Sequence, residues 1–221
     1  MIARDLINPL VPALEEHDDT GKATSLMDDL MISQLPVVKD DTFRGFITND
    51  MLFDDFFNHD TVGQYELRDW ECSVRQDQHF YEIVKVLSDC DQSMVAVVGD
   101  QKEFMGVVDL SALVNFFAGT TAVQSPGGII ELSIKQIDYS LTEITRLIEA
   151  DGVKVVGCFL RNDPHDPTKL KLTLKLDRKD VTRTVATLER FNYHVQALFQ
   201  EELVDSHEKE RLDALLKYLD M

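Results

Sequence analysis

The sequence predicts a mixed α+β protein in which an internal repeat is followed by a different third unit. Two short apolar strands around a tight turn occur at residues 35–47 and again at 95–108, about sixty residues later. After Ser-Pro-Gly-Gly at 125–128 the pattern changes, and leucines alternate strictly with polar residues over 170–176. Such alternation predicts a strand with one buried face. We therefore expect two βαββα repeats, then a βαββαβ unit and a final helix.

Each copy of the repeat is expected to contain a short strand, an amphipathic helix, two strands joined by a tight turn, and a second helix. Apolar residues precede the strand pair at helical spacing in both copies: Ala23, Met27 and Leu30, then Ile83, Leu87 and Cys90. Residues that cap helices stand at the expected helix starts: Asp18, Asp19, Thr20 and Thr48, then Asp77 and Asp109. Two copies that face each other would bury apolar strand faces that neither copy buries alone.

The third unit is expected to contain four strands and two helices. The strands are at 129–134, 153–160, 170–176 and 193–199, and the helices at 141–150 and 180–191. This order, βαββαβ, is that of the ferredoxin-like fold. A stripe of leucines predicts a last, acidic helix: Leu212, Leu215, Leu216 and Leu219. The expected boundaries are 1–62 and 63–124 for the two repeat copies, 128–200 for the third unit and 201–221 for the last helix.

The formal charge of −18, from 22 basic and 40 acidic side chains, excludes two classes of partner. Nucleic acid requires clustered Lys and Arg for its phosphates, and an anionic membrane surface repels an acidic protein. The charge is uneven, because the two repeat copies carry −9 and −6, the third unit +1 and the last segment −4. The uncharged stretch 110–130 contains too many polar residues and glycines to span a membrane.

The three cysteines, Cys72, Cys90 and Cys158, are widely spaced and form no Cys-x-x-Cys pair. An odd number of cysteines without metal-binding spacing favours a reduced protein that has no zinc site. The first residues contain no apolar run of the secretory kind. We therefore expect a cytoplasmic protein.

Two sets of residues carry a family resemblance: Leu35-Pro36-Val37-Val38 with Gly45-Phe46-Ile47-Thr48 in copy one, and Val97-Val98 with Gly106-Val107-Val108 in copy two. On these residues the repeat resembles a tandem pair of CBS domains, and the third unit resembles an ACT domain. Together, residues 1–200 resemble bacterial CBS–ACT proteins of the acetoin-utilisation accessory type. The resemblance implies a regulatory module whose cleft binds AMP, ATP or S-adenosylmethionine. It also implies an ACT domain that pairs with a second copy and binds an amino acid.

The nucleotide signature of the CBS family is Gly, two hydrophobic residues, Thr or Ser, two residues of any kind, then Asp. Copy one matches through Gly45 and Thr48. Met51 stands at its Asp position, and Asp50 lies one residue early, rotated by roughly 100° on the helix. Copy two has Asp109 in place of the hydroxyl, where a carboxylate repels phosphate. The resemblance thus implies an adenosine site formed by Leu35, Pro36, Val37, Thr48, Asp50 and Asp109.

Ordinary structural roles compete with this interpretation. Thr48 and Asp109 are good N-caps in their own right, and residues 35–37 serve equally well as a core strand. The nearby cations are compatible with solvated side chains: Arg44, Arg68, Arg75 and Lys102. In the ACT-like unit, Gln136 and Tyr139 stand where amino-acid-binding members have an acid and a glycine. This departure favours dimerisation over amino-acid binding.

Three further clusters have simpler explanations. Residues 163–166, Asp-Pro-His-Asp, are of metal-ligand types, but the prolines around them favour a polar turn. Asp54, Asp55, Asn58, His59 and Asp60 are of types that attract a divalent cation, and a solvated helix end accounts for them equally. The pairs Phe56-Phe57 and Phe116-Phe117 occupy equivalent places and are assigned to the core between the copies.

The leading hypothesis is a non-catalytic regulatory protein that senses an adenosine-type ligand and forms a homodimer through its ACT-like unit. No nucleophile with a partnered base, P-loop or dinucleotide-binding turn is present, so an enzyme is disfavoured. One alternative is a structural or interaction protein that has lost small-molecule binding and acts on an unidentified protein partner. The other is a divalent-cation sensor.

Overall fold

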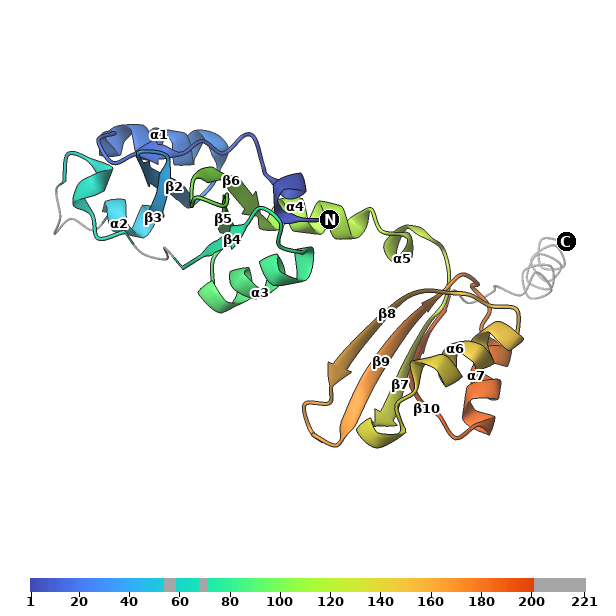
Figure 1. Ribbon diagram of the computed structural model, residues 1–221. Coiled ribbons are helices and arrows are strands. Elements are labelled where there is room, and N and C mark those ends of the chain that lie inside the picture. The colour runs from blue at the N-terminus through green and yellow to red at the C-terminus, as the bar shows by residue number, and fades with distance from the viewer. Residues whose placement is uncertain (54–58, 68–70, 201–221) are drawn as a thin grey trace, which may run out of the picture. The chain divides into compact units, whose positions relative to one another are not determined.

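The computed structural model describes residues 1–53, 59–67 and 71–200. The chain divides into two compact units, Met1–Phe117 and Ala118–Met221, each of which combines helices with a sheet or sheets (Figure 1). The predicted mixed α+β class is therefore confirmed. The helix expected at 201–221 lies outside the described residues.

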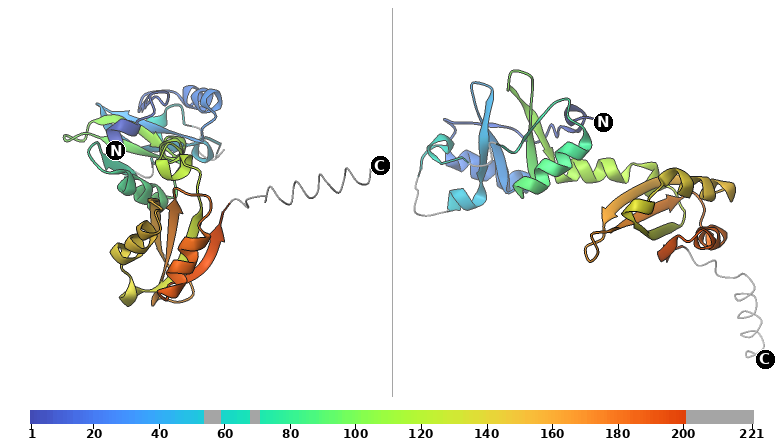
Figure 2. Two further views of the ribbon diagram at one scale, coloured as in Figure 1. Left: turned by 90° about the vertical axis from the view of Figure 1, so that its right-hand side faces the viewer. Right: turned by 60° about the horizontal axis from the view of Figure 1, so that its bottom comes forward.

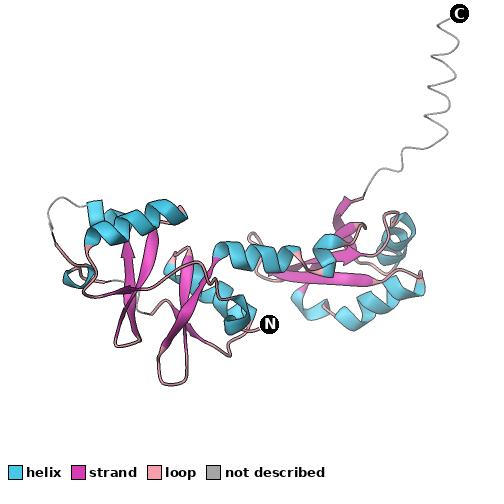
Figure 3. Ribbon diagram, turned by 90° about the horizontal axis from the view of Figure 1, so that it is seen from above, coloured by secondary structure: helices cyan, strands magenta, loops and turns pink. Residues whose placement is uncertain are grey.

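Unit 1, Met1–Phe117, contains two copies of one βαββα arrangement. Copy one consists of β1 (Leu14–Glu15), α1 (Thr20–Leu30), β2 (Gln34–Lys39), β3 (Thr42–Thr48) and α2 (Asn49–Phe53). Copy two consists of β4 (Ser73–Arg75), α3 (Phe80–Cys90), β5 (Met94–Val98), β6 (Phe104–Asp109) and α4 (Leu110–Ala118). In each copy the first strand runs parallel to the second. The second and third strands form an antiparallel pair (Figure 3). The sequence repeat is thus a repeat of structure.

The glycine of each strand pair has a conformation that side chains rarely adopt. Gly45 has φ of 145° and lies opposite Val37, and Gly106 has φ of 146° and lies opposite Val97. A register shift follows each of these pairs, so both hairpins carry the same bulge. At Gly106 a Cβ atom would also lie 2.5 Å from Cγ2 of Ile7. The backbone alone therefore accounts for the two glycines of the signature.

The two copies share a core across their sheets. Met94, Ala96 and Val107 of copy two are at most 1% exposed and pack in one cluster with the buried residues of copy one. The rings of Phe43 and Phe104, one from each copy, stack with centroids 6.1 Å apart. The prediction that the copies bury each other's apolar strand faces is confirmed.

A short helical segment before the first strand of each copy packs on the other copy. Segment η1 (Ala3–Leu6) lies in the core of copy two, and η2 (Val62–Gln64) places Val62 in the core of copy one. β-bridges anchor both segments: Ile2 with His79, and Thr61 with Asp19. Each copy is thus completed by the segment that leads into the other, which ties the pair into one compact unit.

The helix caps of unit 1 follow the prediction at all but one position. Asp19 accepts a hydrogen bond from the backbone N–H of Lys22 at the start of α1. The predicted cap Asp77 is wrong, because α3 starts at Phe80 and His79 is its N-cap, with Glu82 completing a capping box. Asp77 instead forms an exposed ion pair with Arg75.

Phe116, one of the four phenylalanines assigned to the core between the copies, lies in the core of copy two, contrary to the prediction. Phe116 packs on Phe80 inside copy two, with ring centroids 4.8 Å apart, and Phe117 is 39% exposed. The Phe43–Phe104 pair does lie between the two copies. Phe56 and Phe57 lie outside the described residues.

The expectation of three reduced cysteines is also wrong. Cys72, directly before β4, and Cys90, the last residue of α3, form a disulfide with Cα atoms 6.1 Å apart. The two cysteines are 18 residues apart, so their spacing in the sequence did not indicate a pair. They meet because α3 folds back along β4 and brings Cys90 close to Cys72. Cys158 is unpaired and exposed. The expectation of a cytoplasmic protein therefore loses the support it drew from the cysteines.

Unit 2 begins with the short helix α5 (Thr121–Gln124) and then has the predicted βαββαβ order. Its elements are β7 (Ile129–Lys135), η3 (Gln136–Asp138), α6 (Leu141–Ala150), β8 (Val155–Asn162), β9 (Lys169–Leu176), α7 (Thr182–Arg190) and β10 (His194–Phe199). The strand order is β10-β7-β9-β8, and all neighbours are antiparallel. Helices α6 and α7 cover one face of this sheet (Figures 1 and 2).

The alternating leucines of β9 hold the core of unit 2. Leu172, Leu174 and Leu176 are fully buried against α6 and α7, while the intervening Lys and Thr side chains lie on the other face. The strand predicted at 153–160 instead runs from Val155 to Asn162, because the turn at Gly152 (φ 75°) ends α6 first. The uncharged stretch 110–130 forms α4, α5 and the start of β7. Within the described residues, no helix has the length and apolar character required to span a membrane.

Candidate functional site

A cavity of about 490 Å³ lies between the two copies of unit 1, and we call it the copy-two cleft. Residues from both copies and from the N-terminal segment line it: Asn8, Leu10, Val11, Leu30, Met31, Ile32, Ser33, Ser93, Met94, Asp109, Leu110 and Ser111. It contains Asp109, the residue at the hydroxyl position of the copy-two signature. A cavity of this volume is large enough for a nucleoside-sized ligand.

The carboxylate of Asp109 is held at the cleft wall by three donors. Nδ2 of Asn8 and Oγ of Ser111 each donate a hydrogen bond of 2.6 Å, and the backbone N–H of Ala112 donates one of 2.7 Å. Burial acts to raise the pKa of Asp109, but these hydrogen bonds outweigh it and the pKa lies below its usual value. Asp109 is therefore ionised at neutral pH, and it also caps α4 as predicted.

Asn8 is a member of this site that the sequence did not indicate. Its backbone N–H donates to the carbonyl of Val107, which aligns the N-terminal segment with β6 and brings the side chain to Asp109. The two residues are 101 positions apart and belong to different parts of the repeat. No spacing rule links them, so only the folded chain shows the contact.

In copy one the equivalent positions carry different side chains. Oγ1 of Thr48 accepts a hydrogen bond of 3.3 Å from the backbone N–H of Met51, so Thr48 caps α2 as predicted. Asp50 is exposed in the first turn of α2. The backbone matches that of copy two, since Asn49 N–H donates to Ser33 and its counterpart Leu110 N–H donates to Ser93.

Gln34 is a second residue that sequence reasoning missed. It is only 3% exposed, and its Nε2 has no hydrogen-bond partner among the described residues. Gln34 lies directly across the β2–β3 ladder from Thr48. Its counterpart in copy two is Met94, which lines the copy-two cleft. A buried amide donor without an acceptor costs free energy, so its presence beside Thr48 requires an explanation.

The residues proposed as an adenine wall are deeply buried. Leu35 and Val37 are 0% exposed and pack in the shared core, and Pro36 is buried as well. Their side chains therefore perform the core role, and a ligand would reach only their backbone. Strand β1 pairs with β2 at Val37 and Val38, so it does not extend alongside residues 34–36.

The cations suggested as phosphate partners are placed elsewhere. Arg44 approaches Glu16 at 3.5 Å and Arg75 approaches Asp77 at 3.1 Å, in both cases as exposed side chains. Lys102 is exposed in the β5–β6 turn, and Arg68 lies outside the described residues. None of these residues is among those that line the copy-two cleft.

Unit 2 has a cavity of about 730 Å³ at the end of β7, with Asp138, Glu143, Lys169 and Tyr193 in its lining. Burial and the adjacent carboxylate of Glu143 raise the pKa of Tyr193. Tyr139, at the position where amino-acid-binding relatives have glycine, packs against the core of unit 2. The close backbone approach that glycine would permit is therefore blocked by a side chain at this position.

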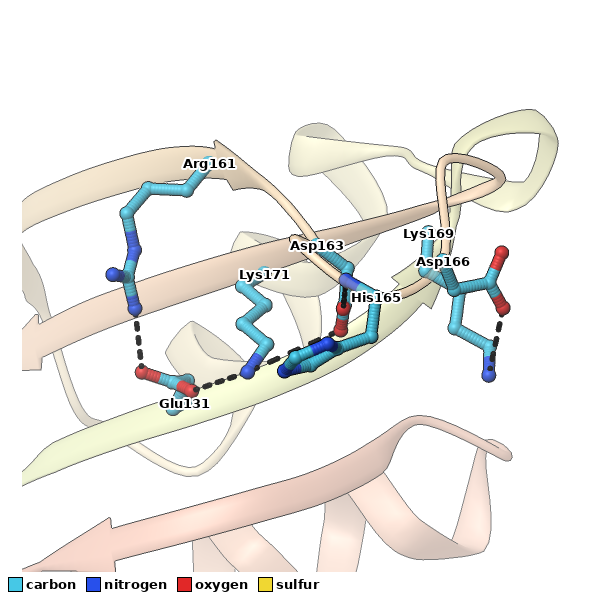
Figure 4. Close-up of polar contacts among 7 residues, drawn as sticks. All are labelled: Glu131, Arg161, Asp163, His165, Asp166, Lys169 and Lys171. Carbon is cyan, nitrogen blue, oxygen red and sulfur yellow. Dashed lines mark hydrogen bonds and ion pairs between the residues drawn. The ribbon is translucent and has the colours of Figure 1, made fainter.

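The open face of the unit 2 sheet carries an ion-pair network. Figure 4 shows Glu131 between Arg161, at 3.3 Å, and Lys171, at 4.0 Å, with Lys171 also 3.9 Å from Asp163. Asp163 accepts a hydrogen bond from the backbone N–H of His165, which lowers the pKa of the carboxyl group. Residues 163–166 therefore form a polar turn.

Among the described residues, no group of three or more His, Cys, Asp or Glu side chains is arranged to hold a metal ion. Three members of the acidic cluster that was considered as a cation site lie outside the described residues: Asp54, Asp55 and Asn58.

Several solved structures that resemble this chain are described as CBS-domain proteins. A CBS domain pair/ACT domain protein from Thermotoga maritima is 16% identical, with a TM-score of 0.49, over 53% of this chain and 96% of its own. CBSX2, a CBS-pair protein from Arabidopsis thaliana, is 15% identical, with a TM-score of 0.47, over 52% and 93%. The CBS domains of a transcriptional regulator from Streptococcus pneumoniae are 19% identical, with a TM-score of 0.47, over 52% and 98%.

A structure of CBSX2 in complex with AMP is 15% identical to this chain, with a TM-score of 0.46, over 52% of this chain and 95% of that one. No family model matches the chain, and no curated protein matches it. Each of these four structures matches about half of this chain.

Proposed function

We propose that this protein is a non-catalytic regulator that senses an adenosine-type small molecule, such as AMP, in unit 1 at the Gln34–Thr48 site of copy one. The observation that carries the proposal is the unpartnered Nε2 of Gln34, which is buried and lies opposite Thr48. A ligand that supplies a hydrogen-bond acceptor there would remove the cost of the buried donor. Purine nitrogens and ribose oxygens are acceptors of this kind.

The neighbouring side chains are of complementary types. Thr48 presents a hydroxyl group, and Asp50 presents an exposed carboxylate that accepts hydrogen bonds from ribose hydroxyl groups. The site contains no paired nucleophile and base, which supports binding without chemistry. Ligand binding would favour one relative arrangement of the two copies, and so change the surface offered to a protein partner.

Thermal shift with AMP, ATP, S-adenosylmethionine and NADH at millimolar concentration tests the proposal. A ligand present at 100 times its dissociation constant stabilises a folded protein by about 2.7 kcal/mol, which is a rise of several degrees in Tm. The matched variant is Gln34→Met, which installs the residue of copy two. We expect a shift with at least one ligand in the original protein and none in Gln34→Met. No shift with any of the four ligands would contradict the proposal.

The second part of the proposal is a homodimer formed through unit 2. Strand β8 is an edge strand in which Cys158, Phe159 and Leu160 are all exposed, the last two by 44% and 46%. Uncovered apolar edge strands tend to pair with another chain. Antiparallel pairing of β8 with β8 of a second copy would continue the sheet about a two-fold axis. The near-neutral charge of residues 128–200 allows this approach.

Light scattering, which measures the molar mass in solution, tests the dimer with one lysine substitution on each edge strand of the unit 2 sheet. Leu160→Lys on β8 should give a monomer, because a buried lysine opposes strand pairing at that edge. The control is Leu198→Lys on β10, the opposite edge, where Leu198 is 39% exposed. A dimer that survives Leu160→Lys, or that is lost in Leu198→Lys, would place the interface elsewhere.

A structural or interaction dimer without a ligand is the second candidate function. The hydrogen bonds that Asp109 receives from Asn8, Ser111 and Ala112 favour it, because they give the copy-two signature residue a structural role. Native mass spectrometry distinguishes the candidates. A mass equal to that of two chains with nothing bound, together with no thermal shift, would support the second candidate.

The proposal includes a cytoplasmic location, where AMP and ATP are abundant. Cell fractionation tests it, and recovery of the protein outside the cytoplasm would remove that part of the proposal.

A further inference from the structure

We infer that the copy-two cleft is a second ligand site, which accepts a neutral or positively charged nucleoside-sized molecule and rejects a phosphorylated one. This goes beyond the proposed function, which concerns copy one, and rests on it only in treating unit 1 as a ligand-binding pair. Three features of the cleft carry the inference: its lining, the fixed position of Asp109, and the apolar side chains at its rim.

The lining has a negative charge and no positive one. Asp109 is the single charged side chain among the twelve described residues that line the cleft, and none of the twelve is Lys, Arg or His. The other polar groups are the amide of Asn8 and three serine hydroxyls. Phosphate sites in proteins are built from cations or clustered N–H donors. The lining has no cation, and at the start of α4 the N–H of Leu110 is bonded to Ser93 and that of Ala112 to Asp109.

The charge on Asp109 cannot move away from a ligand. Asn8, Ser111 and the N–H of Ala112 hold both carboxylate oxygens at 2.6–2.7 Å. A surface carboxylate would rotate into solvent when a phosphate approached, but rotation here would break all three hydrogen bonds and uncap α4. Repulsion of an anion is therefore built into the cleft, and attraction of a cation accompanies it.

The rim supplies apolar surface for a ring system. Leu10 is 73% exposed and Met31 is 93% exposed, and both line the cleft. Met31 is held in this position by a left-handed backbone conformation at the C-terminus of α1. Exposed large apolar side chains in the lining of a cavity favour a ligand with an apolar ring system.

A series of probes that differ mainly in charge tests the inference. Adenosine is neutral, AMP is an anion, and 5′-amino-5′-deoxyadenosine is a cation at neutral pH. Isothermal titration would be carried out in the Gln34→Met protein, in which the copy-one site is silenced. We expect the amino compound to bind most tightly, adenosine next, and AMP at least ten times more weakly than adenosine.

The Asp109→Asn variant assigns the charge effect to the cleft. Asparagine keeps the size of the side chain and remains a good N-cap, so the fold should persist. In the Gln34→Met/Asp109→Asn protein the preference against AMP should fall to less than threefold. Gln34→Met/Asp100→Asn is the matched control, since it removes the same charge from an exposed turn of copy two and should keep the preference.

The outcomes separate this inference from the proposed function. Equal binding of AMP and adenosine in the Gln34→Met protein, or a preference that Asp109→Asn leaves unchanged, overturns the inference. Binding of AMP to the original protein with no binding of any probe to Gln34→Met overturns it while the copy-one proposal stands. Charge-selective binding that is the same with and without Gln34→Met supports it and contradicts the copy-one proposal.

Discussion

Copy one and copy two of unit 1 have the same backbone and different chemistry. Both have a bulged hairpin with a glycine near φ 145°, and in both the residue after β3 or β6 donates its N–H to a serine carbonyl. At one facing pair of each hairpin, however, the side chains differ: Gln34 corresponds to Met94, and Thr48 corresponds to Asp109. The backbone is repeated because the fold requires it. The side chains at these positions differ although both Gln34 and Met94 are buried, so the shared backbone does not fix their chemistry.

The two copies also differ in what their capping residue connects. The hydroxyl of Thr48 accepts a hydrogen bond from the backbone N–H of Met51 in its own copy. Asp109 connects α4 to Asn8, and so ties the N-terminal segment to copy two. A capping residue in copy two therefore contributes to the assembly of the pair, whereas the one in copy one stabilises only its own helix.

The largest expected effect is that of Gly106→Ala. The substitution combines an unfavourable positive φ with a Cβ that lies 2.5 Å from Ile7, and we expect the free energy of unfolding to fall by about 3 kcal/mol. Urea denaturation measures it. A double-mutant cycle with Ile7→Ala should recover the part due to the contact and leave the part due to φ. A loss below about 1 kcal/mol would show that the N-terminal segment does not hold copy two closely.

Asp109→Ala and Thr48→Ala compare the two caps directly. We expect Asp109→Ala to cost about 2 kcal/mol, because it removes the cap of α4 and leaves Asn8 and Ser111 without their acceptor. Thr48→Ala should cost about 1 kcal/mol as a lost cap. Equal losses, measured by urea denaturation, would mean that the contact with Asn8 contributes nothing.

Acid denaturation should show the same asymmetry. The pKa of Asp109 is lower in the folded protein than its usual value of 3.8, so its contribution to stability is complete above that value. The contribution is lost as the pH falls below 3.8 through the folded pKa. Asp109→Asn should therefore lose less stability than the original protein between pH 4 and pH 2, whereas Thr48→Val should follow the original protein. Parallel curves for all three proteins would contradict the assignment.

The smallest expected effect is that of Gln34→Met on the ligand-free protein. Replacing a buried amide that has no partner with an apolar side chain of similar length should raise stability by up to about 1 kcal/mol. The reverse change in copy two, Met94→Gln, should lower stability by about 1–3 kcal/mol, because Met94 is 1% exposed in the shared core. Differential scanning calorimetry of the two variants measures both changes in stability. A destabilised Gln34→Met would mean that the amide has a structural partner.

Much of the fold was predictable because its signals are local or periodic. The βαββα repeat followed from apolar segments at equal spacing, and the alternating leucines of β9 identified the core face of unit 2. The caps at Asp19, Thr48 and Asp109 depend on neighbouring backbone groups, so the sequence alone indicated them. His79 was missed in favour of Asp77 because histidine is a less common cap.

The candidate site was predictable only where its chemistry is local. The carboxylate of Asp109 and the hydroxyl of Thr48 are read from the signature itself. Gln34 was not identified, because an unpartnered donor is defined by what surrounds it. The Cys72–Cys90 disulfide was missed for the same reason, since it depends on the return of α3 to the start of β4.

The sequence by itself determined the order of elements, the internal repeat and the position of the acidic charge, since each is a property of neighbouring residues or of their spacing. Only the tertiary structure decided that each copy is completed by a segment leading into the other, and that Asn8 holds Asp109 across 101 residues. The physical reason is that hydrogen bonding and burial act over a few ångströms in space. Distance along the chain predicts such contacts only within one helix or hairpin.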